Sequence, residues 1–162
     1  MAVTDDIIAT YRGPSRMVRA LLQREKREDR LFILLIAGCV MLFVIFAPRE
    51  ARQAHLDDTV PLAARLYWSA FFWVMIMPFV FYLLAALTRV VSLPFIKELN
   101  WYGARMALFW AVLASAPVGL LFGLVAGMIG PGMQQKIVGI LWLGIFLWFW
   151  VAGLTAAGEG ET

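Results

Sequence analysis

Four long stretches of this 162-residue chain contain no charged residue, and this restricts its fold more than any other feature. They cover residues 31–48, 66–88, 106–135 and 137–158. An apolar helix needs about 20 residues to cross a hydrocarbon core roughly 30 Å thick. The apolar residues run continuously and do not alternate with polar ones, which excludes membrane β-strands. We therefore predict an all-α membrane protein with a four-helix transmembrane bundle.

The composition agrees with a membrane location. The chain is 62% hydrophobic and 15% charged, whereas a soluble domain is about 45–50% apolar and about 25% charged. Its net charge of +3 suits contact with the bilayer and its anionic lipid headgroups. Outside the apolar runs no basic segment is interleaved with stacking aromatics, so we expect no nucleic-acid partner.

We expect three segments along the chain. A basic, amphipathic cytoplasmic arm occupies residues 1–30, the transmembrane domain 31–158, and a short acidic tail 159–162. The predicted spans cover about 31–48, 66–88, 106–129 and 137–157, with a turn around residues 130–132.

The distribution of Lys and Arg predicts the orientation. If the N-terminus is cytoplasmic, the inner side carries seven basic residues in the arm and three in the second loop, against three and one in the outer loops. The positive-inside rule then places both termini in the cytoplasm.

The arm is expected to contain two short helices. Gly13-Pro14 interrupts the first, and Pro14 suits the first turn of the second. The second helix places apolar residues such as Met17 and Leu21 on one face, and we expect it to lie along the headgroup layer. Docking of a cytoplasmic partner is the alternative. The predicted membrane-surface residues are Arg16, Arg19, Arg24, Lys26 and Arg27.

Small residues recur every fourth position within the third apolar run. They are Ala111, Ser115, Gly119, Gly123 and Gly127, and this spacing places them along one helix face. Each glycine costs about 0.8–1 kcal/mol relative to alanine in a helix in water, but in lipid small residues let helix backbones approach closely. We predict a helix-packing interface, either within the bundle or with another membrane protein or second copy.

Groups that carry chemistry are scarce. One cysteine, Cys39, and one histidine, His55, cannot make a metal site alone. The predicted spans hold no Asp, Glu, Lys, Arg or His, which disfavours a transporter. We expect no enzymatic activity, cofactor or metal. An aromatic surface at Trp142, Phe146, Trp148 and Trp150 leaves a bound quinone or pigment as an alternative.

Two segments carry a family resemblance: REDRLFILLIAGCVMLFV at 27–44 and ARMALFWAVLASAPVGLLFGLVAGMIGPG at 104–132. They resemble the Yip1 family, most of all its short alphaproteobacterial forms. Eukaryotic members typically have five spans and an Asp-Leu-x-Gly-Pro motif, of which only Gly13-Pro14 is present here. The resemblance implies a non-enzymatic membrane organiser in a bacterial inner membrane.

Three functions follow from these observations. The first is a scaffold or adaptor that acts through helix packing and membrane-surface contact. The second is an accessory or assembly subunit of a respiratory or photosynthetic complex. A small transporter is the third and is disfavoured by the uncharged spans.

Overall fold

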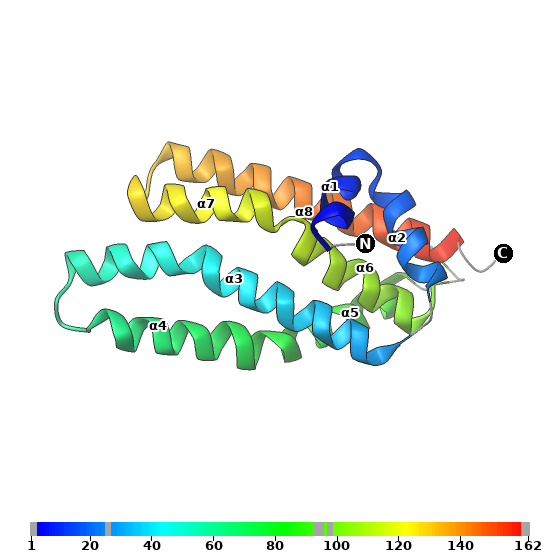
Figure 1. Cartoon of the computed structure of the whole chain (residues 1–162), viewed down its shortest axis with the longest axis horizontal. Helices are drawn as coiled ribbons and strands as arrows, with labels where there is room; N and C mark the ends of the chain where they lie inside the picture. Colours follow the sequence, from blue (N-terminus) through cyan, green and yellow to red (C-terminus); the bar gives the residue numbers. More distant parts are fainter. Residues whose placement is uncertain (1–2, 25–26, 93–95, 97–98, 160–162) are drawn as a thin grey trace.

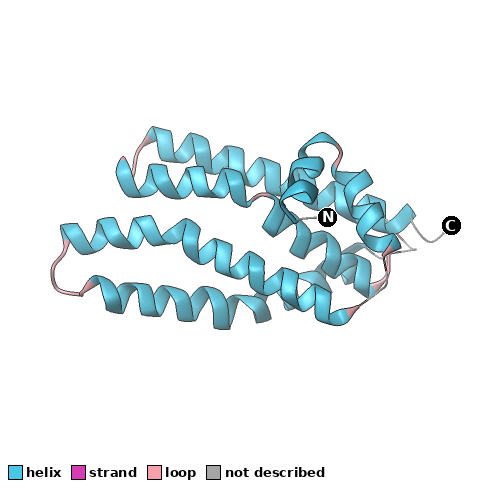
Figure 2. Ribbon diagram, viewed as in Figure 1, coloured by secondary structure: helices cyan, strands magenta, loops and turns pink. Residues whose placement is uncertain are grey.

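The computed structural model describes residues 3–24, 27–92, 96 and 99–159, and all the regular structure in this part of the chain is helical. Figures 1 and 2 show long helices running side by side, with short helices at one end. The elements are α1 (Val3–Arg12), α2 (Pro14–Gln23), α3 (Glu28–Leu56), α4 (Leu62–Ala70), the π-helix η1 (Phe71–Ile76), α5 (Met77–Ser92), α6 (Trp101–Ala114), α7 (Ala116–Met128) and α8 (Met133–Glu159).

The all-α membrane architecture is confirmed. Three helical units are long and apolar enough to cross a bilayer: α3, α8, and the continuous helix Leu62–Ser92 formed by α4, η1 and α5. Helices α6 and α7 are long and apolar enough only as a pair, and they are bent by 46° at their junction. The chain is therefore a multi-pass membrane protein with three spans, or four when the bent pair counts as one.

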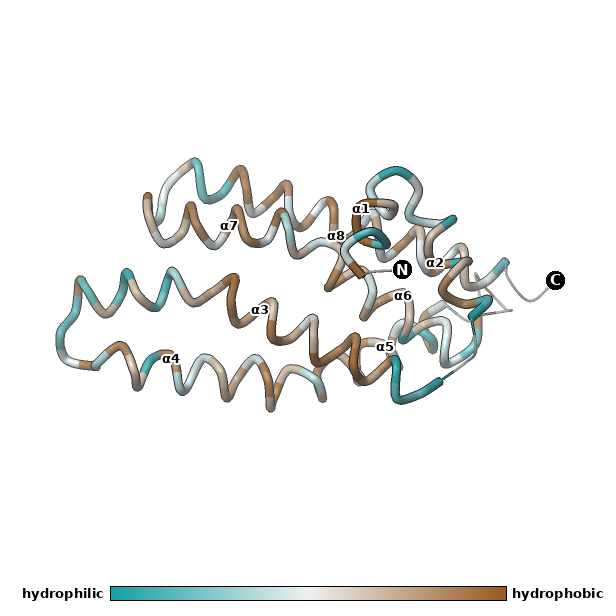
Figure 3. Tube along the Cα trace, in the orientation of Figure 1, coloured by the Kyte–Doolittle hydropathy of each residue, from teal (hydrophilic) through white to brown (hydrophobic). Residues whose placement is uncertain are grey.

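Helix α3 is longer than the apolar run from which it was predicted. It continues through Pro48 to Leu56, and its last turns are polar, as the teal end of its trace in Figure 3 shows. A straight α-helix of this length measures about 43 Å, more than the roughly 30 Å of a hydrocarbon core. The polar end of α3 therefore extends beyond the apolar layer towards the α3–α4 turn.

Two of the three prolines within the predicted spans, Pro78 and Pro117, mark a departure from regular α-helix. Pro117 lies in the first turn of α7, directly after the break at Ser115. Pro78 follows the π-helical segment η1, at whose end the Met77 amide donates to the Phe72 carbonyl. Proline has no N–H and its ring clashes with the carbonyl four residues earlier, which accounts for the local loss of α-helical hydrogen bonding.

Helix α6 forms the centre of the molecule. Every residue from Tyr102 to Ala114 except Arg105 is buried, because α6 is packed against α8, α3, α5 and the N-terminal helices. Helix α7 instead packs against α3 and α8 at the opposite end of the molecule. The described chain begins and ends in the half of the molecule that holds α6 (Figure 1).

Candidate functional site

The three glycines of the predicted interface lie on one side of α7, against α3. A Cβ atom added at Gly123 would overlap the carbonyl oxygen of Ile45, and one at Gly127 would lie 2.5 Å from the Cβ of Pro48. A Cβ atom added at Gly119 would likewise lie too close to side-chain atoms of Ile45 and Trp142. These glycines, the glycine face of α7, therefore permit backbone-to-side-chain and backbone-to-backbone contact between two helices of the same chain.

The other two small residues belong to a different helical segment. Ala111 is fully buried in α6, and Ser115 is 1% exposed at the junction of α6 and α7. The 46° bend thus divides the predicted row of five between two helices. Its cause is Pro117, whose missing N–H leaves the carbonyl of residue 113 without an α-helical partner.

Side chains bond to the carbonyls on either side of residue 113 at this bend. The Tyr11 hydroxyl donates to the Ala114 carbonyl at 3.1 Å. Ser115 Oγ donates to the Val112 carbonyl at 3.1 Å and accepts a 3.3 Å hydrogen bond from Trp142 Nε1. Within a hydrocarbon layer an unpaired backbone group costs several kcal/mol, so these bonds make the bend possible.

Helix α1 is connected to α6 by a second buried group of polar contacts. Thr10 is fully buried, and its hydroxyl donates to the Asp6 carbonyl at 2.7 Å. The same hydroxyl accepts a 3.1 Å hydrogen bond from Trp110 Nε1. The Tyr11 ring packs edge-on against Phe149, with ring centroids 5.0 Å apart. These contacts fix the first helix of the arm against α6 and α8.

The apolar face of α2 is covered by protein. Met17, Val18 and Leu21 are each at most 8% exposed, and α2 packs against α8 and α6. The short N-terminal helices were predicted, but these side chains do not make the lipid contact expected of an interfacial helix. Pairing with α6 and α8 buries the same apolar surface within the chain.

The residues that the arm contacts show where it lies along α8. Phe146 is the middle residue of α8, and Tyr11 packs on Phe149, three residues or about 4.5 Å further along the axis. Val18 lies against Gly153, about 10 Å from that middle. Both contacts lie in the C-terminal half of α8, so the arm packs beside that half of the helix.

The predicted membrane-surface arginines fall into two groups. Three form ion pairs with carboxylates of the chain: Arg19 with Glu159, Arg24 with Asp6 at 3.5 Å, and Arg27 with Asp29 at 3.0 Å. Arg16 is exposed and has no ion-pair partner among the described residues, and the same holds for its neighbour Arg12. Lys26 lies outside the described residues. Of the predicted acidic tail, the described part includes Glu159 alone.

Arg12 and Arg16 border a groove between α1 and α2. It has a volume of about 450 Å³, and Asp5, Ile8 and Met17 also line it. Ile8 is 58% exposed although it is a large apolar side chain. The groove thus combines an apolar side chain with two arginines that have no carboxylate partner in the described chain.

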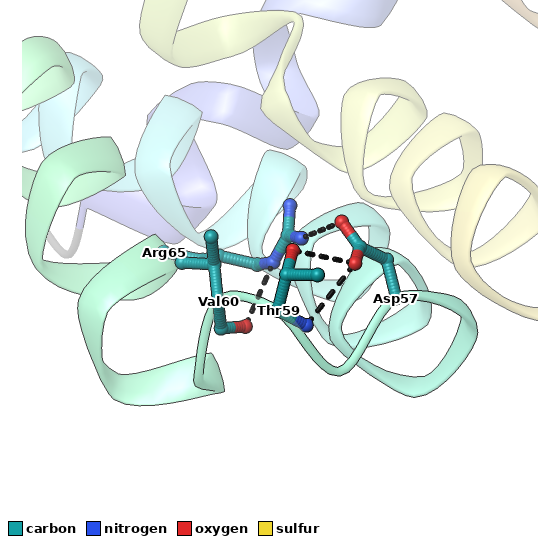
Figure 4. A network of polar contacts seen from close by, with 4 residues as sticks. All are labelled: Asp57, Thr59, Val60 and Arg65. Carbon is teal, nitrogen blue, oxygen red and sulfur yellow. Dashed lines mark hydrogen bonds and ion pairs between the residues drawn. The ribbon is translucent and has the colours of Figure 1, made fainter.

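Two arginines make hydrogen bonds at the opposite end of the molecule, near the α3–α4 turn. Arg52 of α3 donates to the carbonyls of Gly127 and Met128, at 3.4 and 3.2 Å, and so caps the C-terminus of α7. Arg65 donates to the Asp57 carboxylate at 2.8 Å and to the Val60 carbonyl at 3.2 Å across the α3–α4 turn (Figure 4). His55 lies in the last turn of α3, and no group of three metal-binding side chains exists among the described residues.

Asp57 is held in its charged form by the turn. Hydrogen bonds from Thr59 Oγ1 at 2.6 Å and from the Thr59 amide at 3.1 Å lower the pKa of the Asp57 carboxyl, and Arg65 lowers it further. Such bonds favour the carboxylate over the neutral acid. The geometry is that of a stabilised turn.

Comparison with known proteins adds no assignment. No family model, no curated protein and no solved structure matches the chain.

Sequence reasoning missed the residues that join the arm to the bundle. Thr10, Tyr11 and Trp110 carry that connection, yet Thr10 and Trp110 are 100 positions apart. A threonine one turn after an acidic helix start gives no sign of its partner. A row of apolar residues on α2 was the available signal, and it predicted a buried face without identifying what buries it.

Proposed function

We propose that the protein is a non-enzymatic scaffold or adaptor of the bacterial inner membrane, Yip1-like in organisation, with both termini in the cytoplasm. It would act by presenting the α1–α2 groove to an acidic segment of another membrane protein. The observation that carries this proposal is the pair Arg12 and Arg16, exposed beside the groove without a carboxylate partner in the described chain.

The depth of the arm makes a polar partner necessary. Tyr11, the neighbour of Arg12, packs about 4.5 Å from the middle of α8, well inside the hydrocarbon thickness. Placing an arginine near the bilayer centre costs about 2.5–3.5 kcal/mol or more unless it is paired or reaches the headgroups. An acidic side chain beside Arg12 and Arg16 would remove this cost, and exposed Ile8 would supply an apolar contact.

The rigidity of the arm supports the same role. Its helices are fixed to α6 by the Trp110–Thr10 and Tyr11–Ala114 hydrogen bonds. A surface that is already ordered binds without the entropic cost of folding on its partner. The groove is therefore preorganised for docking.

The test is co-purification of a tagged full-length protein. Membranes are extracted in mild detergent, separated on a native gel, and the band is identified by mass spectrometry. We expect a discrete complex that Arg12→Glu with Arg16→Glu disrupts. Arg49→Glu, an exposed charge reversal at the other end of the molecule, should leave it intact. Migration of the wild-type protein alone, in every mild detergent, would contradict the adaptor function.

A second candidate function is an accessory or assembly subunit of a respiratory or photosynthetic complex. The observation that favours it is Gly144, which is exposed in the middle of α8 with no atom within 4 Å of an added Cβ. On the same face lie Ile140, 72% exposed, and Trp148, 52% exposed. A small residue between two large ones leaves space for a helix of another subunit.

The two candidates differ in the surface that they use. Gly144→Leu should release the protein from a larger complex if it is an accessory subunit, and leave an adaptor complex intact. Arg12→Glu with Arg16→Glu should disrupt an adaptor complex and leave the protein bound to a larger complex if it is an accessory subunit. Identification of the co-purifying protein then shows which cellular process the chain serves.

A further inference from the structure

The middle of the bundle contains an apolar pocket of about 260 Å³. Its residues come from four of the long helical segments. They are Leu42 and Phe46 of α3, Trp73 of η1, Met77 and Phe81 of α5, Val112 of α6, Ser115 at the bend, and Trp142, Leu143 and Phe146 of α8. Well-packed protein interiors hold few voids larger than a water molecule, so this space is larger than ordinary packing leaves.

The pocket has a buried floor and an open mouth. Leu42, Phe81 and Val112 are each at most 7% exposed and form the floor, together with Ser115. Trp73, Trp142 and Phe146 are half-buried walls. Leu143 is 56% exposed and lies at the mouth. The pocket therefore opens sideways, towards whatever surrounds the bundle.

The depth of the pocket is set by the helices that line it. Leu42 is the middle residue of α3 (Glu28–Leu56), Met77 that of Leu62–Ser92, and Phe146 that of α8 (Met133–Glu159). Ser115 lies at the junction of the fourth span. All four positions fall halfway along their spans, so the mouth opens at the middle of the bilayer.

The polar groups of the pocket are already used within the chain. Ser115 Oγ donates to the Val112 carbonyl and accepts from Trp142 Nε1. The rest of the wall is apolar and largely aromatic, with Phe46 and Trp73 stacked at 4.7 Å and 10° between their planes. A ligand with a polar group at this depth would lose its own hydrogen bonds to water and gain few here.

We propose that this pocket binds one acyl chain of a bilayer lipid. A transmembrane helix of a partner is about 10–12 Å across with its side chains and does not fit a space of this volume. A dry engineered cavity of about 150 Å³ is already enough to bind benzene, so the present pocket accommodates part of a hydrocarbon chain. At the bilayer centre, lipid acyl chains surround the mouth of the pocket. One of them is therefore available to enter it.

Photolabelling in vesicles tests the site. The full-length protein is reconstituted in phosphatidylglycerol and phosphatidylethanolamine with a trace of phospholipid carrying a diazirine near the end of one acyl chain. After illumination, labelled residues are mapped by mass spectrometry. We expect labelling at Phe81 and Val112, which are at most 7% exposed and form the floor, to exceed, several-fold, labelling at Phe109, which is fully buried and does not line the pocket.

A pair of matched variants distinguishes the pocket from the general lipid surface. Leu143→Trp narrows the mouth and should abolish labelling at Phe81 and Val112. Leu141→Trp adds the same indole at a 52% exposed position that does not line the pocket, and should leave labelling unchanged. In the wild-type protein, equal labelling of Phe109 and of the pocket floor would overturn the proposal, and so would a crosslink showing a partner's side chain in the pocket. The labelling comparison and the crosslinking result are both obtained on the wild-type protein, so they remain valid even if a variant fails to fold.

Discussion

The α3–α7 half of the molecule and the half built around α6 are held together by different forces. Where α7 meets α3, three glycines remove side chains and let Ile45 and Pro48 reach the opposing backbone. Where the arm meets α6, hydrogen bonds of Thr10, Tyr11 and Trp110 connect buried groups. The first contact depends on shape along the helices, with Arg52 bonded to the end of α7, and the second depends on pairing polar atoms that cannot be left unsatisfied.

This difference reflects what each half contains. The glycine face joins two apolar helix segments, where close packing is the available source of attraction because lipid offers equal apolar contact. The arm contributes charged and hydroxyl-bearing helices, and each polar atom that it buries requires a partner. The α3–α7 contact should therefore fail through steric overlap, and the arm contact through loss of single hydrogen bonds.

Gly123→Leu should have the largest effect. Even a Cβ overlaps the Ile45 carbonyl, so the leucine must force α7 away from α3. We expect a loss of unfolding free energy of about 3 kcal/mol, at the upper end of the usual cost of overpacking. It is measured by denaturant unfolding in detergent. Gly144→Leu is the matched control, since nothing lies within 4 Å of its added Cβ, and equal destabilisation by both would show that α7 does not pack closely on α3.

Thr10→Val tests the arm. The valine keeps the shape of threonine but leaves the buried Trp110 Nε1–H without its acceptor. We expect a loss of about 1–3 kcal/mol, the usual cost of a buried unsatisfied donor, and faster proteolysis of the arm. Thr88→Val provides the comparison, because Thr88 bonds only to Leu84 of its own helix in the described structure. An unchanged proteolysis rate for Thr10→Val would mean that apolar contacts alone hold α1.

The Arg105–Glu28 pair should have a small effect although its geometry is good. Both guanidinium Nη atoms donate to the carboxylate, at 2.8 and 2.7 Å, but the Glu28 side chain is 65% exposed. Exposed pairs contribute about 0–1 kcal/mol, because water screens the charges. Arg105→Gln should therefore lower stability by less than Thr10→Val does. The comparison is made by urea unfolding at low and high salt, and a salt-independent loss would point to packing of the Arg105 stem.

The smallest effect is expected at the α3–α4 turn and depends on pH. Since Thr59 lowers the pKa of Asp57, the carboxylate form stabilises the closed turn above the ordinary value of 3.8. This stabilisation is lost as pH falls through the lowered pKa. Hydrogen exchange of the Thr59 amide should therefore speed up in acid beyond its intrinsic pH dependence. Asp57→Asn should show no such step, and Asp58→Asn should retain it.

The sequence was sufficient for the features that arise locally. Apolar runs without charge predicted the long helices. Gly13-Pro14 predicted the break between α1 and α2. Each depends on the residues of one segment, because helix formation in lipid follows from continuous apolar length and from backbone hydrogen bonds within the segment.

Only the tertiary structure decided which surfaces meet. The face of α2 is buried by α6 and α8, Tyr11 pairs with Ala114 across 103 positions, and the central pocket takes its walls from four helical segments. Apolar periodicity reports that a face is buried but carries no information about its partner, since lipid, a neighbouring helix and another protein satisfy it equally. The partner is selected by shape and by hydrogen-bond pairing between distant segments, and these exist only in the folded chain.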